Sequence, residues 1–357
     1  MSEDVYRQLA QRLDAIPNGF PATESGAELR LLAKIFTPEQ AALAAVMSLE
    51  YESAESIAAR AGVDARAAHR QLKEMARQGL IVAGRGERRL GFRLMPFVVG
   101  VYEEQLPRLD AELAGLFEAY LQESRGRTIY GPTPMQRVIP VEEAVPVDVE
   151  IFPFERASAL VEGAKAWAVR DCICRAQQRL IGQGCDHPGH NCLLFAPVEG
   201  VFDHSQVDQP ISKEEALRIL SEAEAAGLVH TTGNYRDQHN YICNCCTCCC
   251  GILRGVAEFG ILSAVAHSAF RVVADAEACA GCEDCVARCQ FGALSVPDDV
   301  CVVDILHCVG CGQCVTVCPS DALHMTRRAE SEMVPLAADR HDWMAQRAEA
   351  RGLTLLD

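Results

Sequence analysis

Apolar residues recur at helical spacing through the first quarter of the chain. The sequence marks several helix ends: Thr37 followed by Pro38 predicts a capped start, and Gly62 predicts a stop. Residues 80–94 then predict two short strands around a basic, glycine-containing turn. The helices expected from this spacing lie over residues 5–13, 29–36, 41–49, 53–62 and 65–79.

The order of helix, turn, helix and two strands resembles the winged-helix domains of bacterial regulators. Residues 28–97 hold 11 Lys or Arg against 8 Asp or Glu, so this segment is locally basic. Its basic side chains could contact DNA phosphates, or they could form a solvated face of a docking module. The residues concerned are Arg66, Arg70, Lys73, Arg77, Arg85, Arg88 and Arg89.

The pattern beyond residue 95 predicts further helices and one long connection. Residues 96–125 are expected to continue as helix, interrupted at Pro107, and the proline-rich stretch 130–154 is expected to run as an extended surface linker. Further helices are predicted over 156–170, over 211–227 with Ser212 as its cap, and over 337–351. The middle of the chain is therefore expected to be mainly helical.

Two near-copies of one cysteine pattern, C-x2-C-x2-C-x3-C, lie between residues 279 and 318. This spacing is typical of 4Fe-4S clusters, in which three thiolates come from one loop and the fourth cysteine of the run binds the other cluster. Each copy continues into a similar tail that predicts a turn and a short strand. The expected ligands are Cys279, Cys282, Cys285 and Cys318 for the first cluster and Cys308, Cys311, Cys314 and Cys289 for the second.

Residues 272–327 resemble the bacterial-type ferredoxins that carry two 4Fe-4S clusters. The resemblance implies a ferredoxin-like fold and single-electron transfer. The chain departs from the family at Gln290, where a proline is usual and where Pro319 stands in the second copy. A structural zinc site is the alternative, but zinc takes four ligands in paired C-x2-C knuckles and has no use for eight cysteines in this phasing.

Ten more cysteines precede these motifs. Residues 243, 246 and 249 repeat the C-x2-C-x2-C triplet, while 245 and 248 form an interleaved C-x2-C, so the run could face two metal centres at once. We expect one or two additional iron-sulfur clusters here, with a zinc site or a thiol/disulfide patch as alternatives. The candidate thiols are Cys172, Cys174, Cys185, Cys192, Cys243, Cys245, Cys246, Cys248, Cys249 and Cys250; the candidate histidines are His187, His190, His204, His230 and His239, the first two being the best placed.

The composition indicates the cell compartment and the kind of partner to expect for these sites. The 357 residues are 49% hydrophobic, enough to fill ordinary cores, and the 19 cysteines without a signal-peptide pattern indicate a reducing cytoplasm. No apolar run is long enough to predict a membrane span. The net charge of −16 favours basic partner surfaces over nucleic acid. Cys301 lies in an apolar strand pattern and is expected to be buried packing.

The sequence therefore predicts a multidomain α+β protein, with a winged-helix-like N-terminal domain, a Cys-rich middle domain and a C-terminal dicluster domain. The leading function is electron transfer to or from a partner oxidoreductase, because a fully ligated cubane moves electrons and makes few bonds. The alternatives are a redox-sensing transcription regulator and a reductase acting at the Cys-rich site; no flavin or nicotinamide motif is evident. The predicted divisions are an arm over 1–27, the winged-helix-like domain with a trailing helix over 28–127, a linker over 128–155, the Cys-rich domain over 156–271, the dicluster domain over 272–327 and a helical tail over 328–357.

Overall fold

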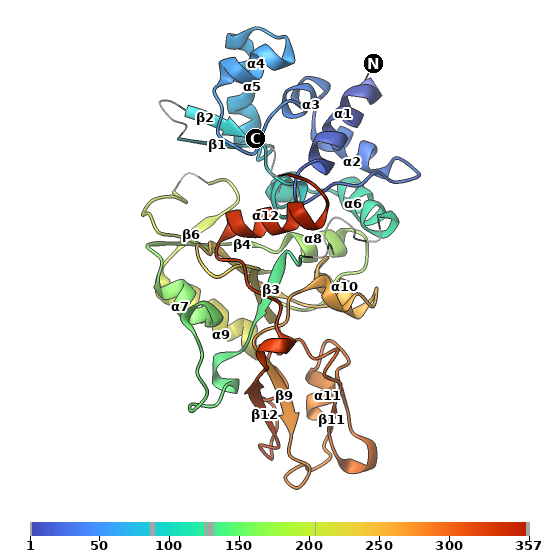
Figure 1. The fold of residues 1–357 in the computed structure, drawn as a ribbon, viewed down its shortest axis with the longest axis vertical. Coiled ribbons are helices and arrows are strands. Elements are labelled where there is room, and N and C mark those ends of the chain that lie inside the picture. Colours follow the sequence, from blue (N-terminus) through green and yellow to red (C-terminus); the bar gives the residue numbers. More distant parts are fainter. Residues whose placement is uncertain are drawn as a thin grey trace. The chain divides into compact units, whose positions relative to one another are not determined.

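The structure is a computed structural model of the chain, and it describes residues 2–85, 90–124, 126, 131, 133–203 and 205–354. The backbone divides into two compact units, and each is described by itself. Unit 1 comprises Met1–Thr133 with Met344–Asp357, and unit 2 comprises Pro134–Trp343. Both helices and sheets are present, so the chain has a mixed α+β fold (Figure 1).

Among its described residues, unit 1 contains helices and one antiparallel pair of strands. Local capping explains several helix ends: Thr37 and Gln40 form a reciprocal capping box at the start of α3, and Gly62 ends α4 with a left-handed φ of 69°. The elements are α1 (Ser2–Asp14), α2 (Ala27–Ile35), α3 (Pro38–Ala44), α4 (Ala54–Ala61), α5 (Ala65–Arg77), β1 (Val82–Arg85), β2 (Leu90–Arg93) and α6 (Ala111–Glu123).

The helices and strands predicted over residues 29–94 are confirmed, with shifts at their ends. The prediction of helix over 96–125 is wrong in its first part, because the backbone of Val98 and Gly100 is not helical and α6 begins only after its cap at Asp110. Residues 1–27 do not form a separate arm, since Leu9 and Phe20 are buried in the core of unit 1.

Helix α5 buries one face and exposes its cations. Ala68, Leu72 and Met75 face the core, while Arg66, Arg70, Lys73 and Arg77 are exposed. DNA contact by this face stays a prediction; the expected wing residues Arg88 and Arg89 lie outside the described residues.

Unit 2 is organised around a six-stranded antiparallel sheet of order β3-β7-β8-β5-β4-β6. Helices α7 and α9 cover one face, where Val161, Ile219, Leu193 and Ile242 share an apolar core. The elements are β3 (Gln136–Ile139), α7 (Ala157–Glu162), β4 (Ala166–Asp171), α8 (Ile173–Leu180), β5 (His190–Ala196), β6 (Gln209–Ile211), α9 (Lys213–Ala225), β7 (Val229–Gly233), β8 (Tyr241–Cys245) and α10 (Leu253–Ala257).

The expectation of a mainly helical middle domain is wrong. Helix α9 and its cap at Ser212 are confirmed, but the helix predicted over 156–170 ends at Glu162 and is followed by strand β4. Strands β7 and β8 are short, and their polar and cysteine residues hide the alternation that identifies a half-buried strand.

The expected surface linker over 130–154 is also wrong, because it contains the buried strand β3. All four residues of β3 are buried, and β3 pairs with β7 at the edge of the sheet. Gln136 and Arg137 make strand β3 hard to predict from the sequence, because buried amide and guanidinium groups are unusual in a strand. The next residues, Val141 and Ala144, join a core with the C-terminal motif region.

The cysteine-motif region forms a lobe over residues 268–328, named here the C-terminal lobe, which in Figure 1 contains the strands labelled β9 (Phe270–Ala274) and β12 (Leu323–Arg327). The strands predicted after each motif are confirmed as β10 and β12. The lobe and tail contain β9 (Phe270–Ala274), α11 (Asp284–Arg288), β10 (Leu294–Ser295), β11 (Val302–Val303), β12 (Leu323–Arg327) and α12 (Arg340–Ala350).

Short 3₁₀ helices connect the main elements, and α12 begins in unit 2 and ends in unit 1. In the part of the chain that the structure describes, none of the helices is long and apolar enough to cross a bilayer. The 3₁₀ helices are η2 (Glu103–Arg108), η3 (Glu142–Ala144), η4 (Pro153–Glu155), η5 (Leu262–Ala264), η6 (Pro297–Asp299) and η7 (Glu330–Glu332).

Gly310 tests how closely the lobe is packed around its second motif. Its φ is 73°, and an added Cβ would lie 2.0 Å from the carbonyl oxygen of Phe270 and 2.3 Å from Oγ of Ser268. We expect Gly310→Ala to lower the free energy of unfolding by more than the roughly 1–2 kcal/mol of left-handed strain alone, because a backbone carbonyl has to move as well. Denaturant unfolding of the anaerobically purified protein measures this loss.

Gly292→Ala is the matched control. Gly292 has a similar φ of 63°, but an added Cβ would meet nothing within 4 Å. It should therefore cost only the strain of about 1–2 kcal/mol. Equal losses in the two variants would contradict the close approach of Phe270 to Gly310.

Candidate metal centres

One pocket of the C-terminal lobe brings together four motif cysteines. Three come from the loop before α11 and from its first turn, and the fourth comes from the end of the second motif. The remaining lining is mostly apolar and includes Ala280, Val296 and Leu323, as suits an inorganic cluster shielded from water. These residues fit a 4Fe-4S cluster held by Cys279, Cys282, Cys285 and Cys318, the set expected from the spacing.

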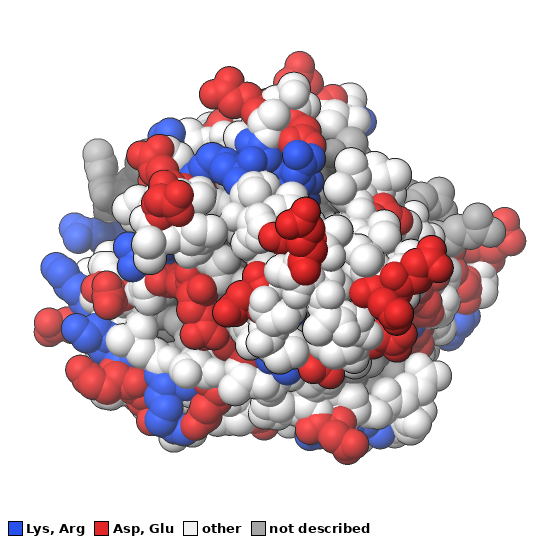
Figure 2. Space-filling view, turned by 90° about the horizontal axis from the view of Figure 1, so that it is seen from below, with Lys and Arg blue, Asp and Glu red and all other residues white. Residues whose placement is uncertain are grey.

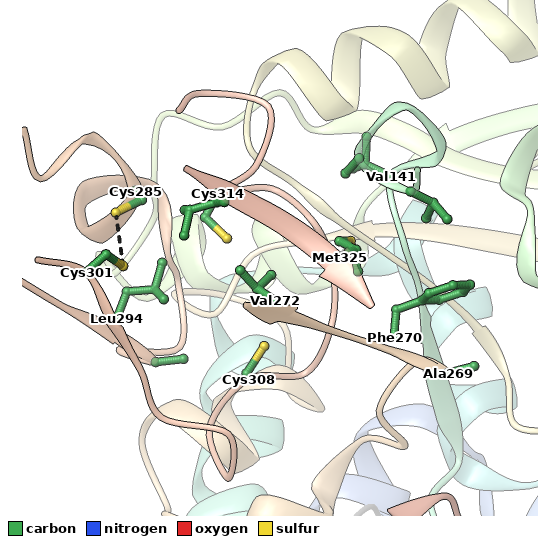
Figure 3. Close-up of a cluster of buried hydrophobic side chains, with 14 residues drawn as sticks. Val141, Ala269, Phe270, Val272, Cys285, Leu294, Cys301, Cys308, Cys314 and Met325 are labelled. Atoms are coloured by element: carbon green, nitrogen blue, oxygen red, sulfur yellow. Dashed lines mark hydrogen bonds between the residues drawn. The ribbon is translucent and has the colours of Figure 1, made fainter. Parts of the chain in front are cut away.

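Cys301 also lines this pocket, although sequence reasoning treated it only as packing. It is buried, as expected, and its Sγ lies 3.8 Å from Sγ of Cys285; Figure 3 shows the two thiols facing each other beside Leu294. Its backbone N–H donates to Sγ of Cys279 at 3.3 Å. This N–H would stabilise an anionic thiolate, so the position contributes to the centre through its backbone as well.

The other four motif cysteines lie near one another at a second location in the lobe, where Cys308 and Cys314 are buried. Cys289, Cys308 and Cys311 lie close enough to interact electrostatically, and Cys314 is close to all three. Burial raises the pKa of the Cys311 thiol to about 12, so a metal ion has to displace this proton when it binds. The set fits a second 4Fe-4S cluster by its donors and burial.

The C-terminal lobe is tied to the sheet next to this second location. The backbone N–H of Val141, just after β3, donates to the carbonyl oxygen of Cys311 at 2.9 Å. The side chain of Gln313 donates to the carbonyl oxygen of Leu228 at 2.7 Å. Arg288 donates to the carbonyl oxygen of Glu224 at 2.6 Å.

Gln290 also connects the lobe to the rest of unit 2 by hydrogen bonds. These bonds give a reason for glutamine at the position where proline is usual. Its Oε1 accepts from the backbone N–H of Thr247 at 2.8 Å, and its Nε2 donates to the carbonyl oxygen of Gly227. Proline could make neither bond. Because Gln290 follows Cys289 and Thr247 lies between Cys246 and Cys248, the contact joins two cysteine loops directly.

Four of the ten other cysteines form a compact group beyond the end of β8. Their Sγ atoms lie within 4.8 Å of one another, and Sγ of Cys185 is 3.9 Å from Cys246 and 3.5 Å from Cys249. A tetrahedral metal with bonds of about 2.3 Å to sulfur separates its ligands by about 3.8 Å, so the spacing suits one zinc or iron ion. This four-cysteine group consists of Cys185, Cys246, Cys248 and Cys249.

The thiols of this group differ in charge state: burial raises the pKa of the Cys248 thiol to about 12, whereas the pKa of Cys246 is lowered. A hydrogen bond from Cys249 and the nearby guanidinium of Arg175 lower the pKa of the Cys246 thiol to about 5, against the opposing effect of burial. Cys246 is therefore a thiolate near neutral pH. Thiolates are the form in which cysteine binds metals.

The other six thiols lie apart from the four-cysteine group, around β5, β8 and the start of α8. The run from residue 243 to 250 therefore serves two groups, as expected, but the division does not follow the C-x2-C phase: Cys243 is separated from Cys246 and Cys249. The second group consists of Cys172, Cys174, Cys192, Cys243, Cys245 and Cys250.

The candidate histidines are mostly occupied elsewhere. His187 comes nearest to a thiol, with Nδ1 at 4.0 Å from Sγ of Cys248. His190 bonds the carboxylate of Asp171 at 2.7 Å. His230 lies between Asn244 and Glu224, His239 bonds Thr232, and His204 lies outside the described residues.

Arg175 was missed in the sequence and lies between the two groups of thiols. It is 1% exposed and donates to Oδ1 of Asn191 at 3.0 Å and to the carbonyl oxygen of Asn244 at 2.8 Å. Burial lowers its pKa, but the thiols of Cys172, Cys246 and Cys245 raise it further, so the cation is retained. Its position directly after C172-I-C174 was the available signal.

Comparison with known proteins supports part of this picture. Residues 301–324 match the family model of the 4Fe-4S binding domain, which covers the second motif. Neither a curated protein nor a solved structure matches the chain. The match and the four-cysteine group establish an iron-sulfur-binding protein with a further candidate metal site.

Cys318→Ala and Cys301→Ala distinguish a ligand from a neighbour in the same pocket. We expect Cys318→Ala to lose about four irons per chain, the content of one cubane, because it removes one of four ligands. Cys301→Ala should keep its iron, since its backbone N–H remains. Counts of iron and acid-labile sulfide after anaerobic purification measure both outcomes. If Cys301→Ala lost iron and Cys318→Ala kept all of it, Cys301 and not Cys318 would be the fourth ligand.

Proposed function

We propose that the chain relays single electrons between a redox partner protein and the thiol-rich sheet of unit 2, through two 4Fe-4S clusters in the C-terminal lobe. The observation that carries this proposal is the pocket in which cysteines of both motifs meet. A cubane with four thiolate ligands has no open coordination site, so its chemistry is electron transfer. The partner is an oxidoreductase or its electron-carrying subunit.

The relay has one buried end, where electrons would pass between the second cluster and the thiols of the sheet. The contacts around the ligands of the second cluster support this end. Hydrogen bonds from Gln313 and Arg288, and those of Gln290, connect the motif loops to the sheet and to the Cys-rich run. Such contacts hold the cysteine loops at a fixed separation. A fixed short separation is what electron transfer between protein-bound centres requires.

The exposed end of the relay is supported by the surface around Cys282, which is itself exposed. Within residues 272–327, Arg288 and Arg327 are only partly exposed and both donate to carbonyl oxygens. Figure 2 shows acidic side chains in several groups on one face of the molecule. The exposed acids of this segment are Asp275, Glu277, Glu283, Asp284, Asp298, Asp299, Asp304 and Asp321.

Apolar side chains accompany these acids. Val302, Ile305 and Leu306 are 49%, 50% and 63% exposed, close in sequence to Asp299 and Asp304. Interfaces between redox partners combine charge complementarity, which speeds encounter, with a small apolar contact. A partner with a basic rim around an apolar centre fits this surface.

Reduction of the purified protein tests the relay. Anaerobic protein should accept at least two electrons per chain from dithionite, and the reduced lobe clusters should show magnetic coupling in their paramagnetic resonance spectrum, since the two cysteine sets share the run from Cys279 to Cys289. Absence of iron from the lobe, or clusters that no low-potential donor reduces, would overturn the proposal.

Glu277→Lys tests the exposed end. We expect it to slow oxidation of the reduced protein by the cationic oxidant hexaamminecobalt(III) several-fold at low salt, because it reverses a charge near Cys279. The difference should shrink as the ionic strength approaches 0.1 M, where the screening length is about 10 Å. Stopped-flow absorbance measures the rate.

Glu199→Lys is the control, because Glu199 is an exposed acid on the loop after β5 and its reversal changes the net charge equally. It should leave the rate near that of the unsubstituted protein. Equal slowing by both variants would show that total charge, and not the surface around Cys282, governs the reaction.

Gln290→Ala tests the buried end. It should leave the iron content unchanged but slow the exchange of electrons between the lobe and the Cys-rich run, because the loops of Cys289 and Thr247 lose their direct contact. Loss of these bonds should also cost about 1 kcal/mol of stability. Gln183→Ala, at an exposed glutamine, is the control for both measurements; an unchanged exchange rate in Gln290→Ala would remove this contact from the route.

A further inference from the structure

Strand geometry gathers the second group of thiols on one face of the six-stranded sheet. Leu193 of β5 and Ile242 of β8 are Cα partners and pack in the core beneath α7 and α9. Side chains alternate between the two faces of a strand. Cys192, Cys243 and Cys245 therefore point to the opposite face.

The remaining three thiols reach this face from helix starts and complete a closed ring. Cys172 and Cys174 flank the first residue of α8, and Cys250 precedes α10. Each of the six thiols interacts electrostatically with two of the others. The six-thiol ring runs in the order Cys172, Cys174, Cys250, Cys245, Cys243, Cys192 and back to Cys172.

Two neighbouring polar side chains lie against these thiols, and the amide of Gln136 donates to one of them. Nε2 of Gln136 lies 3.8 Å from Sγ of Cys243, and Oγ1 of Thr231, which is 0% exposed, lies 3.5 Å from Sγ of Cys245. The Thr231 hydroxyl donates its one proton to Oε1 of Gln136 at 3.0 Å, so it would donate to Cys245 only when that sulfur, as a thiolate bound to metal, competes for the proton. Donors of this kind stabilise anionic sulfur.

A buried cation supports the same conclusion. Arg175 is 1% exposed, interacts electrostatically with Cys172 and Cys245, and has an Nε atom without a hydrogen-bond partner among the described residues. An isolated buried charge costs several kcal/mol, so a fully protonated ring would leave Arg175 poorly compensated. Thiolates bound to metal supply the missing negative charge.

Six thiols in one place are more ligands than a single metal ion or one cubane takes. A tetrahedral zinc or iron ion takes four ligands, and so does a 4Fe-4S cubane. The four-cysteine group accounts separately for Cys185, Cys246, Cys248 and Cys249. Because each of the six thiols interacts with two of the others, the six form one connected group and could bind a single polynuclear centre.

We propose that the six-thiol ring holds a polynuclear iron-sulfur cluster, separate from the two clusters of the C-terminal lobe and from the metal of the four-cysteine group. Each thiol gives up its proton when it binds iron, and inorganic sulfide with ferrous and ferric iron come from outside the chain, so none of the six thiols is oxidised. The proposal goes beyond the relay, because the cluster can be counted whether or not electrons reach it. It also gives the relay a buried end point.

The test is a pair of double variants compared with the unsubstituted protein. Cys192→Ser with Cys250→Ser removes two thiols from opposite sides of the ring. We expect it to lose at least about four irons per chain and a matching amount of acid-labile sulfide, with the lobe signals in the paramagnetic resonance spectrum retained. Cys185→Ser with Cys248→Ser should instead lose about one metal ion and no sulfide.

Several results would overturn the proposal. These are unchanged iron and sulfide in the ring variant, loss of a single metal without sulfide, and three disulfides among the six thiols in protein denatured without reductant. A ring cluster that assembles but exchanges no electrons with the lobe would support this site and contradict the relay, so the two proposals fail separately.

Thr231→Val provides a second test if the double variant does not fold. It keeps all six thiols and removes only the hydroxyl near Cys245. Because hydrogen bonds to sulfur stabilise the reduced cluster, we expect the potential of one cluster to become more negative while those of the lobe clusters stay unchanged. Unchanged potentials for every cluster would contradict a cluster at the ring.

Discussion

The extended backbone of β8 is the constraint on which the arrangement of the metal centres depends. Alternation along Tyr241–Cys245 sends Ile242 into the apolar core and Cys243 and Cys245 to the opposite face. When the strand ends, Cys246, Cys248 and Cys249 turn toward Cys185. A run of cysteines that looks uniform in sequence is thus divided between two groups of thiols, and Cys250, before α10, returns to the group of Cys243 and Cys245.

The same sheet determines where the C-terminal lobe is held. Strand β3 lies at its edge, and the residues that follow pack into the core of the lobe and bond the backbone of Cys311. Leu228, which packs with Cys246 and Cys249, accepts a hydrogen bond from Gln313 of the second motif. The thiol groups and the motif loops therefore share structural supports, and a displacement of either would disturb both.

The sequence was most informative where structure is local. Capping at Thr37 and Ser212 identified helix starts, and cysteine spacing identified a cluster pattern whose second copy matches a 4Fe-4S domain, because both depend on residues a few positions apart. It failed for β3 and for the six-stranded sheet. Pairing of β3 with β7 joins residues about a hundred positions apart, and neither the polar Gln136 nor the cysteines of β8 carry the usual alternation. The partition of thiols depends on that sheet and was equally hidden.

Arg175 gives an independent argument about the charge of the thiol sites. Buried cations in proteins are normally paired with carboxylates, because the desolvation of an unpaired ion costs several kcal/mol. Among the described residues no carboxylate forms an ion pair with Arg175; its polar contacts are Asn191, the carbonyl of Asn244 and sulfur atoms. Neutral thiols are weak acceptors and would compensate little of this cost. Negative charge on the surrounding sulfur, as thiolates bound to a metal would carry it, would compensate this buried guanidinium.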